Sequence, residues 1–376
     1  SFLTSVKLLF SGLRAIAEGK VAAVVLAGGQ ATRLGASKPK DCNSLFALQA
    51  ARIARLQVLA AKQFPSYRPI IHWIIMTSAS TEADTKRHLE EIAQMSELTM
   101  DQITIFNQGE LPCITFDEKL ILSSKSKIAT APDGNGGLYE AIRPHLPRFR
   151  SIGIRYFHVY CVDNILCRVA DPHFIGYCIE KNADCAAKVV EKVDPGERVG
   201  VICKEDGKIK VIEYTELPRD LAEKRTESGK LVFRAGNIAN HFFSLEFLEK
   251  VCSDDYPIIY HLAFKKIPFV DENGTIIKPN SENGYKLEKF IFDVFEFSQN
   301  FFVWEVPRAE EFSPLKNAEN AGKECLSTCL RDLFAEHRRW LKCKSDDDRN
   351  LFVHPNNQVR ISSYSLSVQF ISYNFI

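Results

Sequence analysis

The sequence has no excess charge of either sign, because 48 Lys and Arg residues face 47 Asp and Glu residues and the formal net charge of the 376 residues is +1. An even balance of this kind argues against nucleic acid or an anionic membrane surface as a partner. No apolar run approaches the ~20 residues that cross a bilayer. The apolar segment 6–13 is short and contains Lys7, which favours an amphipathic helix over a cleaved signal.

The sequence also lacks the spacings that cysteine frameworks need. Its eleven cysteines form no Cys-x-x-Cys pair and no metal-ligand pattern, which argues against zinc and against a disulfide scaffold. Cys161, Cys178 and Cys185 lie in apolar stretches, so we expect reduced core residues. These features are typical of a cytoplasmic protein.

Apolar strand-like runs alternate with helical patterns, which predicts an α/β fold with a mostly parallel mixed sheet and helices on both faces. The length allows one large domain with a short carboxyl-terminal appendage. From about residue 320 the pattern changes to a charged helix ending near 344, followed by an uncharged, β-prone tail over 361–376 that needs to be packed. The expected strands are 22–27, 70–77, 103–106, 156–162, 183–190, 199–203 and 210–214, and the expected helices are 45–62, 81–95, 138–145, 172–181 and 286–298.

The most specific motif follows the first expected strand, where residues 26–35 are Leu-Ala-Gly-Gly-Gln-Ala-Thr-Arg-Leu-Gly. Gly28 and Gly29 allow a sharp turn and a close approach to a ligand. Arg33 and Lys40 add positive charge, and no acidic residue lies between them. The Gly-Lys-Ser/Thr of a Walker loop and the Gly-x-Gly-x-x-Gly of a dinucleotide fold are both missing. The motif therefore predicts a different kind of phosphate-binding loop.

A second glycine-rich loop over 131–139, Ala-Pro-Asp-Gly-Asn-Gly-Gly-Leu-Tyr, leads into an expected helix. Free N–H groups at a helix start suit an anion or a ring carbonyl, although a plain turn would explain the motif as well. Upstream, Gln108 follows an expected strand at a sheet edge. Its amide could match the edge of a uracil ring.

A buried strand ends at Asp163 and Asn164. Ligands of open α/β sheets bind at the carboxyl ends of the strands. A single carboxylate there suits Mg²⁺, which keeps several waters and takes only one or two carboxylates when it also binds phosphates. On the residues alone, Asp163 could instead cap the following turn.

Three strand segments downstream carry a polar or glycine residue without a capping role: Gly200, Glu213 and Asn237. Buried carboxylate and amide groups recognise the hydroxyls of a hexose. The aromatic residues of 286–298 fit a helical core stripe, one of which could line a pocket. Lys316, within Phe-Ser-Pro-Leu-Lys-Asn at 312–317, would by itself be taken for a solvated surface lysine.

These motifs together resemble the eukaryotic UDP-sugar pyrophosphorylases, and the match runs nearly continuously from about residue 21 to 317. The family pattern Leu-Ala-Gly-Gly-Gln-Gly-Thr-Arg-Leu-Gly, followed by Pro-Lys-Gly, departs from this sequence only at Ala31 and Asp41. The resemblance implies a nucleotidyltransferase domain over 21–318. It also implies that 1–20 is the helical remnant of a longer family segment and that 319–376 is a shortened carboxyl-terminal segment.

The stretch 288–293 resembles the N-acetylhexosamine branch, which implies uridylyl transfer from UTP to N-acetylglucosamine 1-phosphate with Mg²⁺ as the metal. By resemblance, Arg33, Lys40 and Lys316 are catalytic cations and Asp163 holds the metal. The implied substrate contacts are Gly28, Gly29 and Asn164, the nucleoside contacts Gln108, Gly134 and Asn135, and the sugar contacts Gly200, Glu213, Asn237, Phe290 and Phe292.

Two departures from the family pattern keep alternatives open. Ala31 would cost on the order of 1 kcal/mol if that position needs a positive φ. The Asp41 carboxylate would oppose a phosphate oxygen about 5 Å away by roughly 1 to 3 kcal/mol. The loop after Lys40 is also shorter than in the family. The alternatives are a pyrophosphorylase for glucose 1-phosphate or N-acetylgalactosamine 1-phosphate, and a catalytically impaired paralogue that binds nucleotide sugars. The sequence leaves the oligomeric state undetermined.

Overall fold

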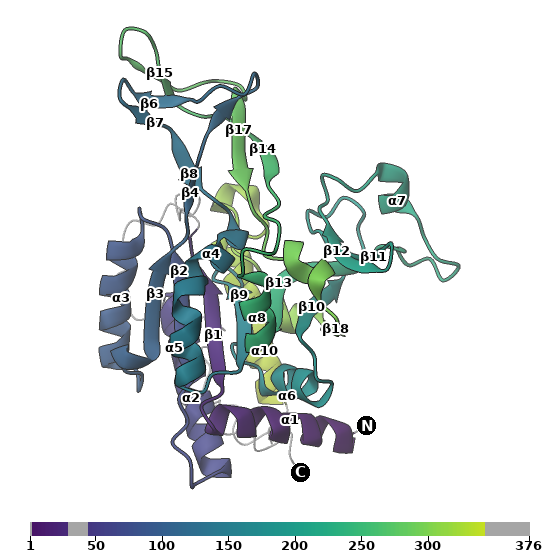
Figure 1. The fold of residues 1–376 in the computed structure, drawn as a ribbon. Coiled ribbons are helices and arrows are strands. Elements are labelled where there is room, and N and C mark those ends of the chain that lie inside the picture. The colour runs from purple at the N-terminus through teal and green to yellow at the C-terminus, as the bar shows by residue number, and fades with distance from the viewer. Residues whose placement is uncertain (1, 29–43, 343–376) are drawn as a thin grey trace.

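The centre of the molecule is a nine-stranded mixed sheet (Figure 1). The structure is a computed structural model that describes residues 2–28 and 44–342. Strands follow the order β12-β11-β13-β9-β1-β2-β3, and β10 pairs with both β13 and β18. The run β9-β1-β2-β3 is parallel, whereas β13 is antiparallel to β9 and to β10. The predicted α/β class with helices around a mixed sheet is confirmed.

The central strands are β1 (Val21–Leu26), β2 (His72–Thr77), β3 (Ile103–Asn107), β9 (Tyr156–Cys161), β10 (Cys185–Glu191), β11 (Val201–Glu205), β12 (Lys208–Ile212), β13 (Ala235–Ser244) and β18 (Phe301–Glu305). The α-helices are α1 (Phe2–Ala17), α2 (Leu45–Gln63), α3 (Glu82–Met95), α4 (Leu138–Ile142), α5 (Leu146–Ser151), α6 (Pro172–Glu180), α7 (Arg219–Glu223), α8 (Leu245–Val251), α9 (Arg308–Glu311) and α10 (Leu326–Lys342). Short 3₁₀ turns are η2 (Met100–Gln102), η3 (Asn135–Gly137), η4 (Arg143–His145), η5 (Asp293–Phe297) and η6 (Glu319–Ala321).

Strand β1 is buried along its whole length because helices cover both faces of the sheet. Ala22, Val24 and Leu26 pack into a core with α4, α5 and α8. The alternate residues, Val21 among them, pack into a second core with α1, α2 and α3. A strand enclosed on both faces needs apolar residues at every position, and residues 22–27 show that pattern.

Helices α1 and α6 cross closely beneath the sheet (Figure 1). A Cβ atom on Gly12 would lie 1.9 Å from the carbonyl oxygen of Pro172. A Cβ atom on Gly176 would lie 1.8 Å from the carbonyl oxygen of Leu8. The two glycines therefore let the backbones approach, and α1 extends the short amphipathic helix expected over 6–13.

Small β-elements project from one end of the central sheet (Figure 1). They are the pairs β4 (Glu110–Pro112) with β8 (Thr130–Pro132), β6 (Leu122–Ser124) with β7 (Lys127–Ile128), and β15 (Phe269–Val270) with β16 (Ile276–Ile277). A three-stranded sheet joins β14 (His261–Lys265), β17 (Gly284–Glu288) and β5 (Ile114–Thr115). None of these short strands was predicted from the sequence.

The helix expected over 286–298 is wrong. Residues up to Glu288 belong to β17, and only Asp293–Phe297 forms a 3₁₀ turn. Apolar residues do recur at helical spacing there, but Leu287 pairs with Leu262 of β14. The connecting loop is then fixed from outside, because Asn135 Oδ1 accepts the N–H of Ile291 at 2.9 Å. Pairing with a distant strand therefore overrides the local periodicity.

Other boundaries differ at turns and prolines. The helix expected over 138–145 ends as α4 at Ile142, and a new helix begins after Pro144. The strands expected over 199–203 and 210–214 are β11 and β12, each shifted by two residues. The charged helix near the end is α10, whereas the tail over 361–376 lies outside the described residues.

Within the described residues, 2–28 and 44–342, the structure has neither a membrane-spanning helix nor a disulfide bond. None of the helices in these ranges is long and apolar enough to cross a bilayer. All nine cysteines that the structure describes are free, and Cys178 and Cys185 are buried as predicted.

Candidate active site

The candidate site begins at the carboxyl ends of the parallel strands. The registers pair Leu26 at the end of β1 with Met76 of β2 and with Cys161 of β9. Residues that follow these strands therefore lie at one edge of the sheet, where α/β folds bind ligands. Gly28, Gln108 and Asp163 are brought to this edge.

Gly28 and Gln108 lie in direct contact. A Cβ atom on Gly28 would lie 2.0 Å from Oε1 of Gln108, so any other residue at this position would have to displace the Gln108 amide. Gln108 is 8% exposed, and its backbone N–H donates to the carbonyl of Thr77 at 2.9 Å. Gln108 directly follows β3, which is the outermost strand of the sheet. The expected position of Gln108 at a sheet edge is therefore confirmed.

The second glycine loop packs against the segment that follows β17. Gly134 has a φ of 87°, and its Cβ would lie 2.4 Å from the carbonyl oxygen of Lys289. The N–H of Gly136 donates to that same carbonyl at 2.9 Å. Because Asn135 Oδ1 holds Ile291, its amide nitrogen is the part of the side chain that can meet a ligand. The loop thus joins the predicted base and sugar contacts.

A buried ion pair, not predicted from the sequence, locks this junction. Lys289 Nζ lies 3.1 Å from Oδ2 of Asp133 and also bonds Glu140. Asp133 is 1% exposed, and its burial raises the pKa of its carboxyl group while Lys289 opposes that rise. The pair connects residues 156 positions apart, a separation at which sequence spacing carries no signal.

Asp163 and Lys316 come together at the end of β9. The N–H of Leu315 donates to the carbonyl of Asp163 at 3.0 Å. Burial raises the pKa of the Asp163 carboxyl group, and the charge of Lys316 lowers it. The Lys316 ammonium also lies 5.9 Å from the centre of the Phe312 ring. Lys316 is therefore part of the candidate site.

Asn164 has a structural position within this site. Its Nδ2 donates to the carbonyl of Glu311 at 2.8 Å, and its Oδ1 accepts the N–H of Ser313 at 3.0 Å. The side chain thus attaches the segment before Lys316 to the end of β9. Because these bonds occupy the side-chain amide, the predicted contact of Asn164 with the substrate would have to come from its backbone.

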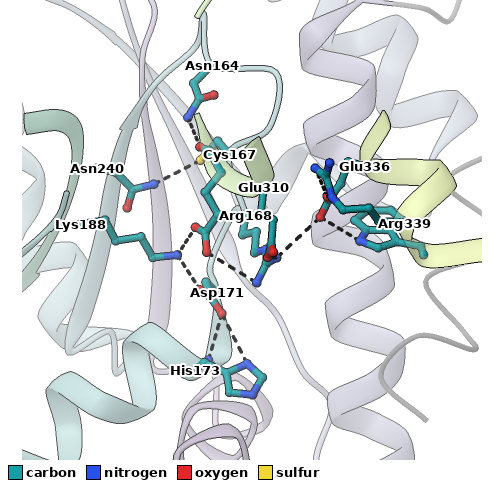
Figure 2. Close-up of polar contacts among 12 residues, drawn as sticks. Asn164, Cys167, Arg168, Asp171, His173, Lys188, Asn240, Glu310, Glu336 and Arg339 are labelled. Atoms are coloured by element: carbon teal, nitrogen blue, oxygen red, sulfur yellow. Dashed lines mark hydrogen bonds and ion pairs between the residues drawn. The ribbon is translucent and has the colours of Figure 1, made fainter. Parts of the chain in front are cut away.

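A buried charged network anchors the same segment from below, and Figure 2 shows Lys188 of β10 directed at Asp171. The Lys188 ammonium lies 2.6 Å from Oδ2 of Asp171 and 2.5 Å from Oε2 of Glu311. Arg168 pairs with Glu310 and Glu336, which connects α9 to α10. Lys188 is fully buried. Lys316 therefore follows a segment that the buried Glu311 attaches to the interior of the protein.

The predicted sugar contacts also converge. A Cβ atom on Gly200 would lie 2.8 Å from Oε1 of Glu213. The N–H of Asn237 donates to the carbonyl of Gly200 at 2.8 Å. Burial, and after it the charge of Glu216, raises the pKa of Glu213, while Lys316 lowers it. Lys316 therefore links the metal side of the site to the sugar side.

The two predicted aromatic contacts differ in exposure. Phe292 is 7% exposed and belongs to the core, whereas Phe290 is half-buried and packs against that core. Their ring centres lie 5.0 Å apart. Phe290 is therefore the ring that can meet a ligand, with Phe292 behind it.

Five positions of the phosphate loop lie outside the described residues. They are Gly29, Ala31, Arg33, Lys40 and Asp41. Their assigned roles stay predictions.

Asp163 fits a metal that needs few protein ligands. In the described ranges, no three His, Cys, Asp or Glu side chains converge as a metal cluster. A half-buried carboxylate just after a strand end suits Mg²⁺, which takes only one or two protein carboxylates when phosphates and waters supply its other ligands.

Comparison with known proteins adds independent findings. Residues 11–369 match the family model described as UTP–glucose-1-phosphate uridylyltransferase. A Caenorhabditis elegans protein named "Probable UDP-N-acetylglucosamine pyrophosphorylase" is 52% identical over 342 residues, which are 88% of this chain and 70% of that protein. The Xenopus tropicalis UDP-N-acetylhexosamine pyrophosphorylase-like protein 1 is 48% identical over 88% of this chain and 66% of its own length.

A solved structure agrees with these relatives. The UDP-N-acetylglucosamine pyrophosphorylase of Trypanosoma brucei, in complex with an inhibitor, superimposes with a TM-score of 0.82. The two sequences are 32% identical, over 90% of this chain and 69% of that one.

Proposed function

The chain belongs to the UTP–glucose-1-phosphate uridylyltransferase family of nucleotidyltransferases, and we propose that it makes UDP-N-acetylglucosamine and pyrophosphate from UTP and N-acetylglucosamine 1-phosphate. The observation that carries the proposal is the convergence of Asp163 and Glu213 on one lysine, Lys316. A metal-binding carboxylate and a hydroxyl-binding carboxylate on either side of one cation suit a phosphate that connects a nucleotide to a sugar.

The reaction forms one P–O bond and breaks another. A phosphate oxygen of the sugar 1-phosphate attacks the α-phosphorus of UTP, and the bond to the β-phosphate bridging oxygen breaks. Pyrophosphate leaves with that electron pair. Both the nucleophile and the leaving group are anionic, so positioning and charge neutralisation carry the catalysis and no covalent protein nucleophile is needed.

The nucleotide side uses the glycine loops. The amide of Gln108 and the backbone at Gly134 contact the base, and Gly28, which precedes the phosphate loop in the sequence, lies against Gln108. Arg33 binds the departing β- and γ-phosphates, and Lys40 offsets charge at the α-phosphorus. Mg²⁺ held by Asp163 supplies further positive charge to the phosphate oxygens.

The sugar side uses Glu213 and Asn237 for the hydroxyls and Phe290 for the acetyl methyl group. Lys316 orients the incoming phosphate between the two sides. The nine free cysteines of the described residues support a reducing compartment, and we place the reaction in the cytoplasm.

The test measures pyrophosphate release from UTP in the presence of Mg²⁺. Three acceptors are compared: N-acetylglucosamine 1-phosphate, N-acetylgalactosamine 1-phosphate and glucose 1-phosphate. We expect N-acetylglucosamine 1-phosphate, as the uridylyl acceptor, to give the largest kcat/KM. Lys316→Met should reduce kcat at least about 100-fold, since a charge at the transferring phosphate is lost. Lys323→Met, at an exposed lysine of the same loop, should retain wild-type turnover.

Other outcomes identify the alternatives. A larger kcat/KM with another sugar reassigns the substrate. Binding of UDP-N-acetylglucosamine without turnover of any sugar makes the protein a catalytically impaired paralogue, and full activity of Lys316→Met removes the role given to that residue.

A further inference from the structure

His261, the first residue of β14, supports the aromatic ring at the sugar side of the site. Its imidazole stacks against Phe290 with 4.2 Å between ring centres and 31° between the ring planes. Among the expected sugar contacts, Phe290 is the half-buried ring beside the buried Phe292. The histidine therefore forms one wall behind the ring assigned to the acetyl group.

Asp293 fixes both partners of this stack. Its Oδ1 lies 3.0 Å from Nε2 of His261, and its Oδ2 accepts the backbone N–H of Phe290 at 2.9 Å. One carboxylate thus sets the position of the histidine ring and of the Phe290 backbone at the same time. A displacement of the imidazole would therefore move Phe290 both through the ring contact and through Asp293.

The other ring nitrogen points to the hydroxyl-binding side. Nδ1 of His261 lies 3.7 Å from Oε1 of Glu216, and the Glu216 N–H donates to the carbonyl of Glu213 at 2.9 Å. The charge of His261 is also felt at Glu213 itself. The imidazole therefore spans the two elements that carry the sugar contacts, the end of β12 and the loop after β17.

We propose that His261 is a specificity-determining residue, which positions Phe290 against Asp293 and Glu216 and thereby sets the preference for an N-acetylated sugar over one with a free hydroxyl. The inference rests on the proposed function. It assigns a role to a residue for which the sequence offered no motif.

The surroundings of His261 are acidic. Asp293 faces it from η5, Glu216 and Glu213 face it from the end of β12, and Glu288 lies opposite it in the β14–β17 register. On the basic side, Lys289 follows on the same loop and lies 5.9 Å from the Tyr260 ring centre. The hydrogen bond with Asp293 raises the pKa of His261 above its usual value, although partial burial opposes it.

Because the pKa of His261 is raised, the charged form that bridges Asp293 and Glu216 persists to a higher pH than it would for a free histidine. As the pH rises through that pKa, the ion pairs with Asp293 and Glu216 weaken. The preference for the acetylated sugar should then fall with increasing pH.

The experiment compares kcat/KM for N-acetylglucosamine 1-phosphate and glucose 1-phosphate across the pH range in which histidine titrates. In His261→Asn we expect the preference to fall about tenfold, through KM for the acetylated sugar and with little change in kcat. In His261→Phe the ring contact is kept and the charge is lost, so the preference should stay at the level that wild type shows at high pH and should not vary with pH.

Leu262→Thr is the matched control, because Leu262 is the 55% exposed neighbour of His261 on β14 and threonine keeps the strand propensity. We expect it to leave the sugar preference at the wild-type value. Thermal unfolding of each variant verifies that it is folded.

An unchanged preference in His261→Asn, or an equal loss in Leu262→Thr, would overturn the inference. The proposed function is judged separately by the wild-type protein. If wild type turns over no sugar phosphate, the same variants are compared by calorimetric affinity for UDP-N-acetylglucosamine and UDP-glucose. A drop in that ratio for His261→Asn alone still supports the role of His261, and an unchanged ratio overturns it.

Discussion

Single glycines decide how closely the walls of the candidate site approach one another. Gly28 leaves room for the Gln108 amide, and Gly200 leaves room for the Glu213 carboxylate. In both positions an added Cβ would come closer to an oxygen atom than real Cβ atoms do. The requirement is steric rather than conformational, since neither glycine is among those with a positive φ.

Replacing Gly200 with alanine should therefore damage the sugar side alone. The new methyl group would displace Glu213, so we expect KM for the sugar 1-phosphate to rise about tenfold or more while KM for UTP stays within about twofold. Steady-state kinetics with each substrate varied in turn measures the two constants.

Gly196→Ala provides the control, because the nearest atom to its Cβ would be Asp194 Oδ1 at an ordinary 3.4 Å. Equal KM values for the sugar 1-phosphate in the two variants would contradict the steric argument.

At the scale of elements, buried charge ties α9 and α10 to the central sheet. Lys188 of β10 meets Asp171 at the start of α6 (Figure 2). It also meets Glu311 at the end of α9. Although burial alone would raise it, the charges of Lys188 and Arg168 hold the pKa of Asp171 below its usual value. Such pairs contribute little net stability compared with apolar residues, but they define one arrangement of the elements. Here that arrangement places the segment leading to Lys316.

Lys188→Met should be strongly destabilising, because it removes the buried ammonium that contacts both the Asp171 and the Glu311 carboxylates. We expect a loss of about 3 to 5 kcal/mol in the free energy of unfolding, measured by urea denaturation. Lys210→Met removes the exposed pair with Glu205 and should cost less than about 1 kcal/mol. Comparable losses in the two variants would show that the buried ion pairs contribute no more to the free energy of unfolding than the exposed pair does.

For the molecule as a whole, two buried histidines of the central sheet stay neutral: His241, which packs against η5, and His158, which packs against Phe174 of α6. His241 has no hydrogen-bond partner at either ring nitrogen, and its ring packs edge-on against Phe295 with 5.0 Å between centres. Burial lowers the pKa of His241 to about 3, and burial lowers that of His158 to about 4. In the unfolded chain both side chains take up a proton near pH 6.5.

The protein should therefore lose stability as the solution becomes acidic. Below about pH 6.5 the unfolded state binds more protons than the folded state, so each depressed histidine costs about 1.4 kcal/mol per pH unit until its folded pKa is reached. Above about pH 6.5 both states are neutral, and neither histidine adds a dependence.

His241→Leu tests this sign, since it removes a titrating group that makes no hydrogen bond. We expect the variant to lose less unfolding free energy than wild type between pH 7 and pH 5. Phe243→Leu on the same strand should lower stability equally at both pH values. A variant of His241 with the wild-type pH slope would refute the assignment.

The sequence by itself determined the features that depend on nearby residues. A fully apolar run predicted β1 and its burial on both faces, glycines marked two candidate ligand loops, and Asp163 after a strand end marked the proposed metal position. The order of these motifs was also sufficient to indicate the family. Local propensity, burial pattern and motif spacing all act within a few residues, which is why they can be recognised without a structure.

Only the tertiary structure decided how distant segments meet. The apolar spacing of 286–298 is helical, yet pairing of β17 with β14 makes its first part a strand. Lys188 and Glu311 are 123 positions apart, and His261 and Asp293 are 32 apart. Such contacts depend on the path of the whole chain, and no periodicity records them. The residues proposed to bind a ligand were therefore visible in the sequence, whereas those that position them became visible only in the fold.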